Sequence, residues 1–132
     1  MKRLLIATLL VSNAAFAGLY DQPYVIIQTD HSRSSDYLIR PVLVNRVDGV
    51  NALADNRAVV EPGKHAVTVD LHPRQGFHTA TQVTFDLDTK PCTRYYVVAR
   101  LETTTGQKWA PLVRSEEPIG ECRTKFKIAA TQ

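Results

Sequence analysis

The chain has 132 residues, 44% of them hydrophobic, and its 16 Lys and Arg against 13 Asp and Glu give a formal net charge of +3. Two of the basic residues, Lys2 and Arg3, stand at the start, so the remainder has 14 basic against 13 acidic residues, a net charge of +1. A nucleic-acid-binding domain gathers Lys and Arg on one face. In this nearly neutral chain basic and acidic residues are mixed along the sequence, so we expect no nucleic-acid partner.

The first seventeen residues have the pattern of a secretory signal peptide. Lys2 and Arg3 form a positive n-region, Leu4–Val11 forms an apolar h-region, and Ala15–Ala17 places small residues before a cleavage site. The apolar run is about half of the roughly 20 residues that a membrane-spanning helix needs, and no later segment is long enough either. We therefore expect a cleaved signal helix at residues 1–17. The rest of the chain is expected to be exported without a membrane span, to a periplasm or alternatively to the medium.

Residues 18–132 have the length of a single domain, and they contain two cysteines, Cys92 and Cys122. An even number of cysteines in an exported chain favours a disulfide, because the compartment outside the cytoplasm is oxidising. The bond would close a loop of about 31 residues and add about 3–4 kcal/mol to the unfolding free energy in the chain-entropy model. A redox or metal-binding pair would instead show close spacing such as C-x-x-C, which the sequence lacks.

The part after the signal segment predicts two strands and a turn. Tyr24–Gln28 (YVIIQ) is a short β-branched run, and Leu38–Val47 (LIRPVLVNRV) is a longer one. Pro41 inside the second run predicts an edge position or a bulge, because proline has no N–H to donate to a ladder. Asp48 and Gly49 then supply a turn signal.

The middle of the chain predicts further strands joined by a second turn. Glu61–Lys64 is a turn signal between the short run Ala58–Val60 and the strand His65–Leu71. This strand and Gln82–Leu87 both alternate between apolar and polar residues, which is typical of a half-buried sheet. The residues on their apolar faces are His65, Val67, Val69 and Leu71 in the first and Val83, Phe85 and Leu87 in the second.

The last third predicts the centre of the sheet and its final strands. Arg94–Leu101 (RYYVVARL) is the most apolar run and is expected to be a central strand. Lys108–Val113 (KWAPLV) follows as another strand, and Lys125–Ala129 (KFKIA) is expected to close the chain as a strand, with no helix after the signal peptide. Seven or eight short strands bounded by turns predict an all-β fold, a single antiparallel β-sandwich over residues 18–132.

Several of these stretches together resemble a known family. "VLVNRVDG", "VVEPGKHAVTVDL", "TRYYVVARLE" and "KWAPLV" are similar to stretches of small exported β-sandwich domains of PEGA type and of related periplasmic domains. In those domains a strand ending in V-D-G precedes a P-G-x-H-x-V-x-V strand, and the similarity here covers about Val42–Val113. The polar stretch "HPRQGFHTATQ" departs from the family, which has an aromatic and glycine-rich segment at that place. The resemblance implies a non-catalytic envelope module with a binding or structural role.

Two polar clusters contain residue types that carry out catalysis elsewhere. "TDHSRSSD" holds Asp30, His31 and three serines, the types of a nucleophilic triad, but all within eight positions. A triad needs its members held from different elements beside an oxyanion hole, and Ser and Asp also dominate loops because they bond to local backbone. We therefore predict a loop. The acidic pair Glu116 and Glu117, beside Pro118, is likewise expected in a solvated turn, so no catalytic residues are predicted.

Three histidines follow one another near the middle of the chain. His65, His72 and His78 are separated by seven and six residues. The odd separation places the first two on opposite faces of one continuous strand, whereas zinc usually needs three or four converging ligands. We therefore expect no metal site and no other cofactor.

Aromatic and arginine side chains form the better candidate binding surface. Trp109, Tyr96, Arg94 and Arg100 are the candidates, because Trp, Tyr and Arg most often anchor interfaces. Tyr95 and Tyr96 are adjacent, so they point to opposite faces of a strand and one of them can be outside. The alternative is that Trp109 and one tyrosine fill the core of the sandwich.

These patterns predict a non-catalytic exported module of the cell envelope, with a binding or structural role and an envelope protein or glycan as its partner. Edge strands would offer a route to pair with another chain by strand addition, which Pro41 and charged residues would limit. One alternative is a secreted or periplasmic inhibitor of a hydrolase that inserts Asp30–Asp36 or Arg74–Thr81 into its target. The least favoured alternative is a small metal-dependent enzyme that uses His65 and His78.

Overall fold

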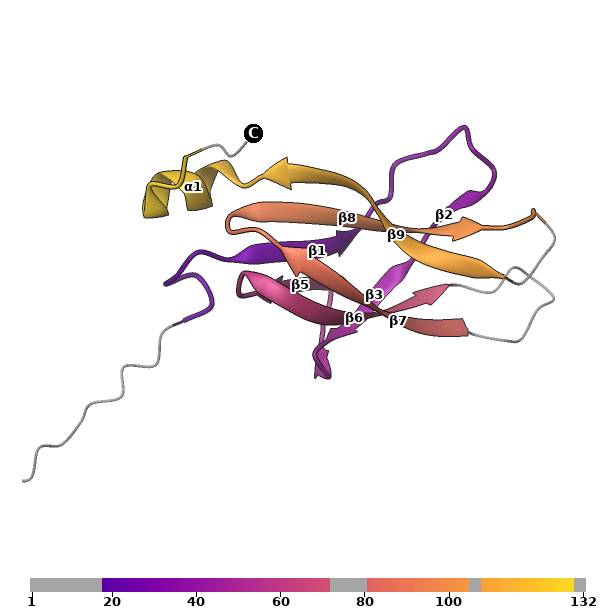
Figure 1. Ribbon diagram of the computed structural model, residues 1–132, viewed down its shortest axis with the longest axis horizontal. Coiled ribbons are helices and arrows are strands. Elements are labelled where there is room, and N and C mark those ends of the chain that lie inside the picture. The colour runs from indigo at the N-terminus through magenta and orange to yellow at the C-terminus, as the bar shows by residue number, and fades with distance from the viewer. Residues whose placement is uncertain (1–17, 72–80, 105–107, 130–132) are drawn as a thin grey trace, which may run out of the picture.

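The structure, a computed structural model, describes residues 18–71, 81–104 and 108–129. The predicted signal peptide lies outside the described residues. The described part of the chain contains nine strands and one helix, and the strands form two sheets that pack on each other (Figure 1). The prediction of an all-β sandwich is confirmed.

Five strands form the first sheet, sheet A: β1 (Val25–Thr29), β2 (Ile39–Pro41), β5 (Arg57–Val60), β8 (Thr93–Leu101) and β9 (Trp109–Pro118). Strand β8 is central, as its apolar sequence predicted. Strand β9 pairs with one side of β8 over its whole length, while β1 and β2 follow one another along the other side. Strand β5 pairs with the outer side of β1.

Four strands form the second sheet, sheet B, in the order β4 (Val50–Asn51), β3 (Leu43–Val47), β6 (Gly63–Leu71) and β7 (Thr81–Thr89). Asp48 and Gly49 close the β3–β4 hairpin with φ angles of 50° and 79°. Two-residue hairpin turns require this left-handed conformation, which Asp and Gly adopt more readily than most residues. The predicted turn at this place is confirmed.

One ladder departs from the predicted antiparallel pattern. Strands β1 and β8 run parallel, with Val25 opposite Thr93 and Thr29 opposite Val97, whereas every other ladder in the described residues is antiparallel. Parallel neighbours need a long crossover between them. The chain makes this crossover by building sheet B between the two strands.

The single strand predicted over Leu38–Val47 is two strands in two different sheets. Pro41 ends β2, an edge strand of sheet A, in agreement with its predicted edge position. Val42 is buried where the chain crosses to β3 of sheet B, and its carbonyl oxygen accepts a hydrogen bond from the hydroxyl of Thr29. Apolar residues continue across the crossing, from half-buried Ile39 of β2 to buried Val42 and Val44, so the composition of the run shows no break.

The main core lies between the inner faces of the two sheets. The alternation predicted for β6 and β7 holds, and Phe85 and Leu87 at the edge of sheet B pack on the core while staying half-buried. Each fully buried Val or Ile side chain contributes about 1.5–3 kcal/mol to this packing. Buried members of the core include Val25 and Ile27 of β1, Val67, Val69 and Leu71 of β6, and Tyr95, Val97 and Ala99 of β8.

The prediction of a strand over Lys125–Ala129, with no helix after the signal peptide, is wrong. This segment holds the last turn of helix α1 (Gly120–Phe126) and the residues that end the helix. Lys127 adopts φ 52° at the C-cap, and the Ile128 N–H donates to the Arg123 carbonyl at 3.0 Å. Five residues of alternating pattern are too few to distinguish a strand from the end of a helix. A helical spacing of apolar residues appears only when Ile119 and Cys122, which precede the segment, are taken together with Phe126.

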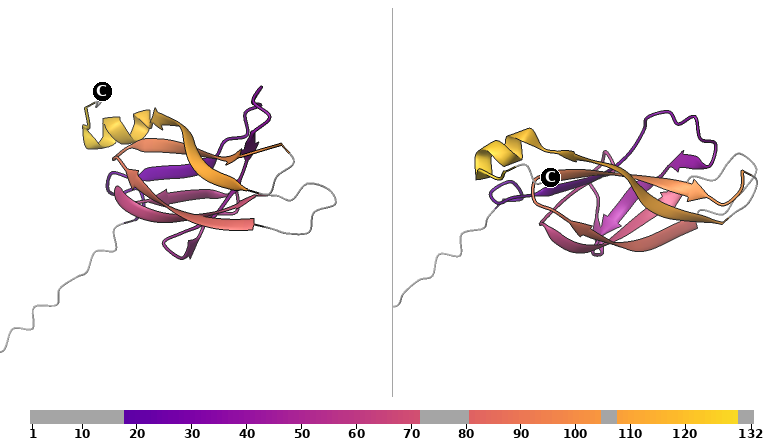
Figure 2. Two further views of the ribbon diagram at one scale, coloured as in Figure 1. Left: turned by 45° about the vertical axis from the view of Figure 1, so that its right-hand side comes forward. Right: turned by 45° about the horizontal axis from the view of Figure 1, so that its top comes forward.

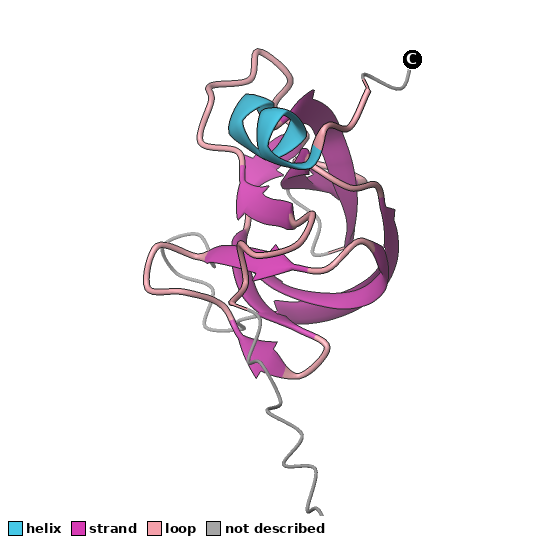
Figure 3. Ribbon diagram, turned by 90° about the vertical axis from the view of Figure 1, so that its left-hand side faces the viewer, coloured by secondary structure: helices cyan, strands magenta, loops and turns pink. Residues whose placement is uncertain are grey.

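Helix α1 covers one end of the outer face of sheet A (Figures 1 and 2). Figure 3 looks at the molecule from that end, with α1 in front of the strands. A second apolar cluster holds the helix there; its buried members are Tyr24, Ile26, Val59, Cys92, Ile119 and Cys122. No helix in the described part of the chain is both long and apolar enough to cross a membrane.

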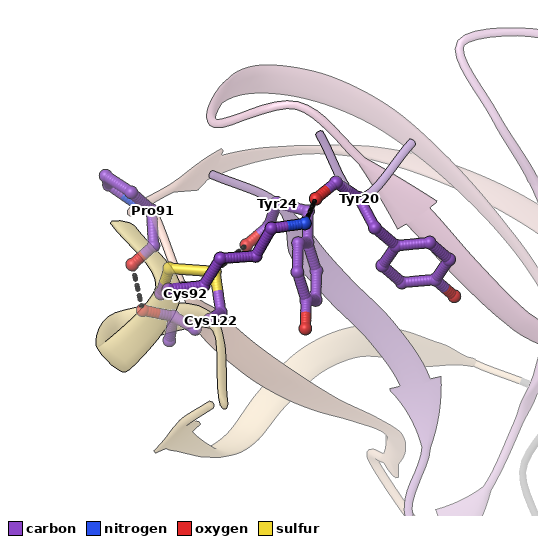
Figure 4. Close-up of a disulfide and its surroundings, with 7 residues drawn as sticks. Tyr20, Tyr24, Pro91, Cys92 and Cys122 are labelled. Atoms are coloured by element: carbon purple, nitrogen blue, oxygen red, sulfur yellow. Dashed lines mark hydrogen bonds between the residues drawn. A yellow bond between two sulfur atoms is a disulfide. The ribbon is translucent and has the colours of Figure 1, made fainter. Parts of the chain in front are cut away.

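The predicted disulfide between Cys92 and Cys122 is present (Figure 4). Their Cα atoms lie 5.3 Å apart, and both residues are fully buried. Cys92 lies just before β8, and Cys122 is the buried residue of α1. The bond therefore fastens the helix to the start of the central strand.

Candidate functional site

Two rows of side chains cross the outer face of sheet A, because residues paired across strands point to the same side of a sheet. The row under α1 runs from β5 to β9 through Val59, Ile26, Arg94 and Glu117. The next row runs through Arg57, Gln28, Tyr96 and Ser115. The first row is therefore apolar on β5 and β1 and charged on β8 and β9, and the second row is polar along its whole length.

The structure brings two of the four predicted binding residues together. Arg94 and Tyr96 both contact Glu117, with Arg94 Nη1 donating to Oε1 at 3.3 Å and Tyr96 Oη donating to Oε2 at 3.4 Å. Arg100 lies on the same face further along β8 and is exposed. Trp109 lies on the inner side of sheet A, where it packs against the main core. This packing matches the alternative expectation, in which Trp109 contributes to the core.

A groove of about 580 Å³ lies beside α1 on the outer face of sheet A, and we call it the α1 groove. Two tyrosines line it, Tyr20 and Tyr24, whose rings meet edge to face with their centroids 4.9 Å apart (Figure 4). Its charged lining comes from four elements and consists of Arg57, Arg94, Glu117, Glu121 and Lys125. The groove thus combines aromatic surface with cations and hydrogen-bond donors.

Polar contacts hold the walls of the α1 groove in place. Lys125 of α1 donates from Nζ to the Tyr20 carbonyl at 2.7 Å, which ties the segment before β1 to the helix. Arg57 Nε lies 3.3 Å from Asp55 Oδ2. Burial, and then the nearby carboxylate of Glu121, raise the pKa of Tyr24. Its phenol therefore stays neutral at physiological pH and keeps its proton as a donor.

The polar run Asp30–Asp36 is a loop between β1 and β2. Asp30 accepts hydrogen bonds from the N–H and hydroxyl of Ser32, and Arg114 Nη1 donates to Asp30 Oδ2 at 3.2 Å. Burial alone would raise the pKa of Asp30, but these hydrogen bonds and the guanidinium outweigh it and lower the pKa. A smaller hollow of about 290 Å³ lies against the loop and Arg114. The polar side chains serve the loop's own backbone and fasten it to β9.

Glu116 and Glu117 lie in β9 rather than in the predicted turn. Both are exposed, and each pairs with a cation: Lys90 Nζ lies 3.2 Å from Glu116, and Arg94 lies 3.3 Å from Glu117. The two carboxylates are neighbours on one strand, so they point to opposite faces of sheet A. They do not form a carboxylate pair.

His65 connects two turns of sheet B. Its Nδ1 contacts Asp48 Oδ2, its Nε2 contacts the Glu61 carbonyl, and Asp48 also accepts from the Ala66 N–H at 2.7 Å. Burial lowers the pKa of His65, but the bonds to Asp48 and Glu61 outweigh it, so the pKa is raised. The bond from His65 lowers the pKa of Asp48 in turn. Both ring nitrogens of His65 are therefore engaged within the fold.

The stabilisation from the His65–Asp48 pair is expected to fade as the pH rises. The raised folded-state pKa means that folding takes up a proton around pH 6.5, the ordinary value of histidine. The contribution is complete below that value and is lost as the pH rises through the folded pKa of His65. On the acid side it is lost as the pH falls from 3.8 through the lowered pKa of Asp48. Because the Asp48 side chain is 50% exposed, the contribution is about 0.5–1 kcal/mol.

Denaturant unfolding between about pH 5 and about pH 9 checks this expectation. The native chain should lose stability relative to the His65→Gln variant across this range. His31→Gln, which changes an exposed loop histidine, should follow the native chain. An identical pH dependence of the native chain and His65→Gln would contradict the role of the pair.

The described residues contain no group of three or more His, Cys, Asp and Glu that could hold a metal ion. His72 and His78, the other histidines of the predicted triplet, lie outside the described residues. The same is true of most of the segment Arg74–Thr81.

The sequence predicted Arg94, which lines the α1 groove, and Tyr96, which contacts the lining residue Glu117, but it did not predict the other side of the groove. Arg57 comes from β5, whereas Tyr20 and Tyr24 come from the stretch before β1, and each carries little signal by itself. One local signal existed: Arg57 is the charged residue that begins an apolar run, RAVV. Its position opposite Gln28 follows only from the pairing of β5 with β1.

Comparison of the chain with protein-family models, with curated proteins and with solved structures finds no match.

Proposed function

We propose that the protein is an exported, non-catalytic binding module of the cell envelope, and that the α1 groove receives part of an envelope protein or glycan. The observation that carries this proposal is the gathering of two arginines and two tyrosines into one groove. They are Arg57 of β5, Arg94 of β8, and Tyr20 and Tyr24 of the stretch before β1, so they come from three separate segments of the chain. The resemblance to PEGA-type domains remains part of this proposal.

The chemistry of these side chains suits recognition rather than reaction. A guanidinium presents several N–H donors in a rigid plane, which fits carboxylates and other oxygen acceptors. Tyrosine rings add rigid apolar surface at low entropic cost, so Tyr and Arg anchor many interfaces. Export is supported by the signal-like pattern of residues 1–17 and by the Cys92–Cys122 disulfide, since such bonds persist in oxidising compartments.

Affinity capture from envelope extracts tests the proposal, with the native chain, Arg94→Ala and Arg100→Ala as baits. Both arginines lie on the outer face of β8, but only Arg94 lines the α1 groove. We expect Arg94→Ala to weaken binding of the captured partner by at least about tenfold, while Arg100→Ala leaves it within about twofold. Thermal melting of each bait verifies that it is folded.

Two outcomes would contradict the proposal. Equal binding by the two variants would remove the α1 groove from recognition. Turnover of an envelope substrate by the purified chain, lost on changing one polar side chain, would make the protein an enzyme.

A second candidate, an inhibitor of a hydrolase, is favoured by the shape of the Asp30–Asp36 loop. The following residue, Tyr37, is 82% exposed, and the loop is fastened to the body by Asp30 and Arg114. A braced, exposed loop can enter a target with little loss of entropy. If the captured partner is a hydrolase that the chain inhibits, and if Tyr37→Ala but not Arg94→Ala abolishes the complex, this candidate replaces the first.

A further inference from the structure

Most edge strands of the described sandwich carry a feature that prevents pairing with another chain. Strand β4 has two residues, β5 has four, and β2 has three and ends at Pro41. Strand β9 is long, but it contains Pro111 and Pro118, and Arg114 is an extra residue that bulges from its ladder with β8. Short length, proline and bulges are the usual protections of a sheet edge.

Strand β7 has none of these protections. It pairs with β6 through nine consecutive residues without a register shift, and Thr81–Thr89 contains no Pro, Gly, Lys or Arg. Its core-facing residues Val83, Phe85 and Leu87 are only half-buried. Some Cα atoms of β9 lie within 8 Å of β7, yet the two strands share no ladder. The edge of β7 that faces away from β6 therefore offers a regular row of backbone N–H and C=O groups to another strand. Such a strand would also bury more of the apolar side chains of β7.

The sequence of β7 is complementary to itself when it is reversed about its middle residue. With Phe85 opposite a second Phe85, Val83 meets Leu87 and Thr84 meets Asp86. Gln82 likewise meets Asp88. Each aspartate thus faces a hydroxyl or amide donor and no aspartate faces another, which is the arrangement that stabilises cross-strand pairs.

We propose that the protein forms a symmetric dimer in which β7 pairs antiparallel with β7 of a second copy, with Phe85 opposite Phe85. A two-fold axis at Phe85 makes the contact isologous, so it closes at two copies instead of growing into a fibre. The two four-stranded sheets become one continuous sheet, and Phe85 gains an aromatic neighbour. Lys64, whose Nζ lies 3.9 Å from Asp86, offsets the negative charge on this face. The contact uses sheet B alone and is independent of the α1 groove on sheet A.

Sedimentation of the full exported chain from about 10 µM to about 1 mM tests the dimer, because a contact of strand size binds weakly. Two variants at one position provide the matched comparison, Thr84→Asp and Thr84→Lys. Both lose the hydroxyl bond to Thr68 at 2.8 Å. In the dimer, residue 84 of each copy faces Asp86 of the other copy, so this pair occurs twice. Asp there adds two repulsions, so the dimer should dissociate at least about tenfold more readily than with Lys.

Hydrogen exchange locates the contact. Alternate backbone amides of β7 should become protected as the concentration rises, because one half of them point away from β6. A chain that stays monomeric up to about 1 mM overturns the proposal. This is also the result expected if β9 already covers the edge of β7. Equal association of the two Thr84 variants, or protection confined to another strand, overturns it as well.

Discussion

The Cys92→Ala, Cys122→Ala double variant is expected to lose about 3–4 kcal/mol of unfolding free energy and to release α1 from sheet A. The native bond closes a loop across a sequence separation of 30 residues, which restricts the unfolded chain. Helix α1 has seven residues, too few to be stable in water without tertiary contacts. The small outer cluster and the exposed bond from Lys125 to the Tyr20 carbonyl would then hold it, and that cluster loses both buried sulfur atoms.

Guanidinium unfolding measures the loss of stability, and hydrogen exchange measures the release of the helix. The amides of Arg123 and Ile128, which donate to the carbonyls of Ile119 and Arg123, should lose protection. The native chain kept reduced should behave in the same way, since it lacks the bond but keeps the side-chain volume. Binding at the α1 groove should weaken too, because α1 supplies one of its walls. Unchanged stability with protected α1 amides would show that packing alone holds the helix.

Tyr95→Ala is expected to cost about 3–5 kcal/mol of stability, whereas Tyr96→Ala costs less than about 1 kcal/mol. The two residues are adjacent on β8, but Tyr95 is 2% exposed in the main core and Tyr96 lies on the outer face beside Arg94. Truncating Tyr95 leaves a cavity between the sheets. Truncating Tyr96 removes one contact to Glu117 and should weaken ligand capture instead.

Denaturant unfolding of the two variants, with binding measured in parallel, checks this pair. Tyr95→Phe is the control, because it keeps the ring and removes only the hydroxyl that accepts from the Lys90 N–H at 2.8 Å. That loss should be about 1 kcal/mol. Similar losses of stability for Tyr95→Ala and Tyr96→Ala would mean that the two rings do not lie on different faces.

The candidate site shows where sequence reasoning stops. The adjacency of Tyr95 and Tyr96 predicted that one ring lies outside, and the alternation along β8 puts Arg94 and Arg100 on the same side as Tyr96. These are local relations along one strand. Trp109 could not be placed in this way, because its side of the sheet depends on the register between β9 and β8. That register shifts at the bulge between Tyr96 and Val97.

The sequence by itself determined the strands with regular alternation, the Asp48-Gly49 turn and the pairing of the only two cysteines, because each depends on neighbouring residues or on composition. The tertiary structure alone decided the split of Leu38–Val47 between two sheets, the helix in place of a strand near Lys125, and the parallel pairing of β1 with β8. It also assembled the α1 groove. These features arise where apolar surfaces distant in sequence cover one another, and the free energy of that burial outweighs the weak local preferences of short segments.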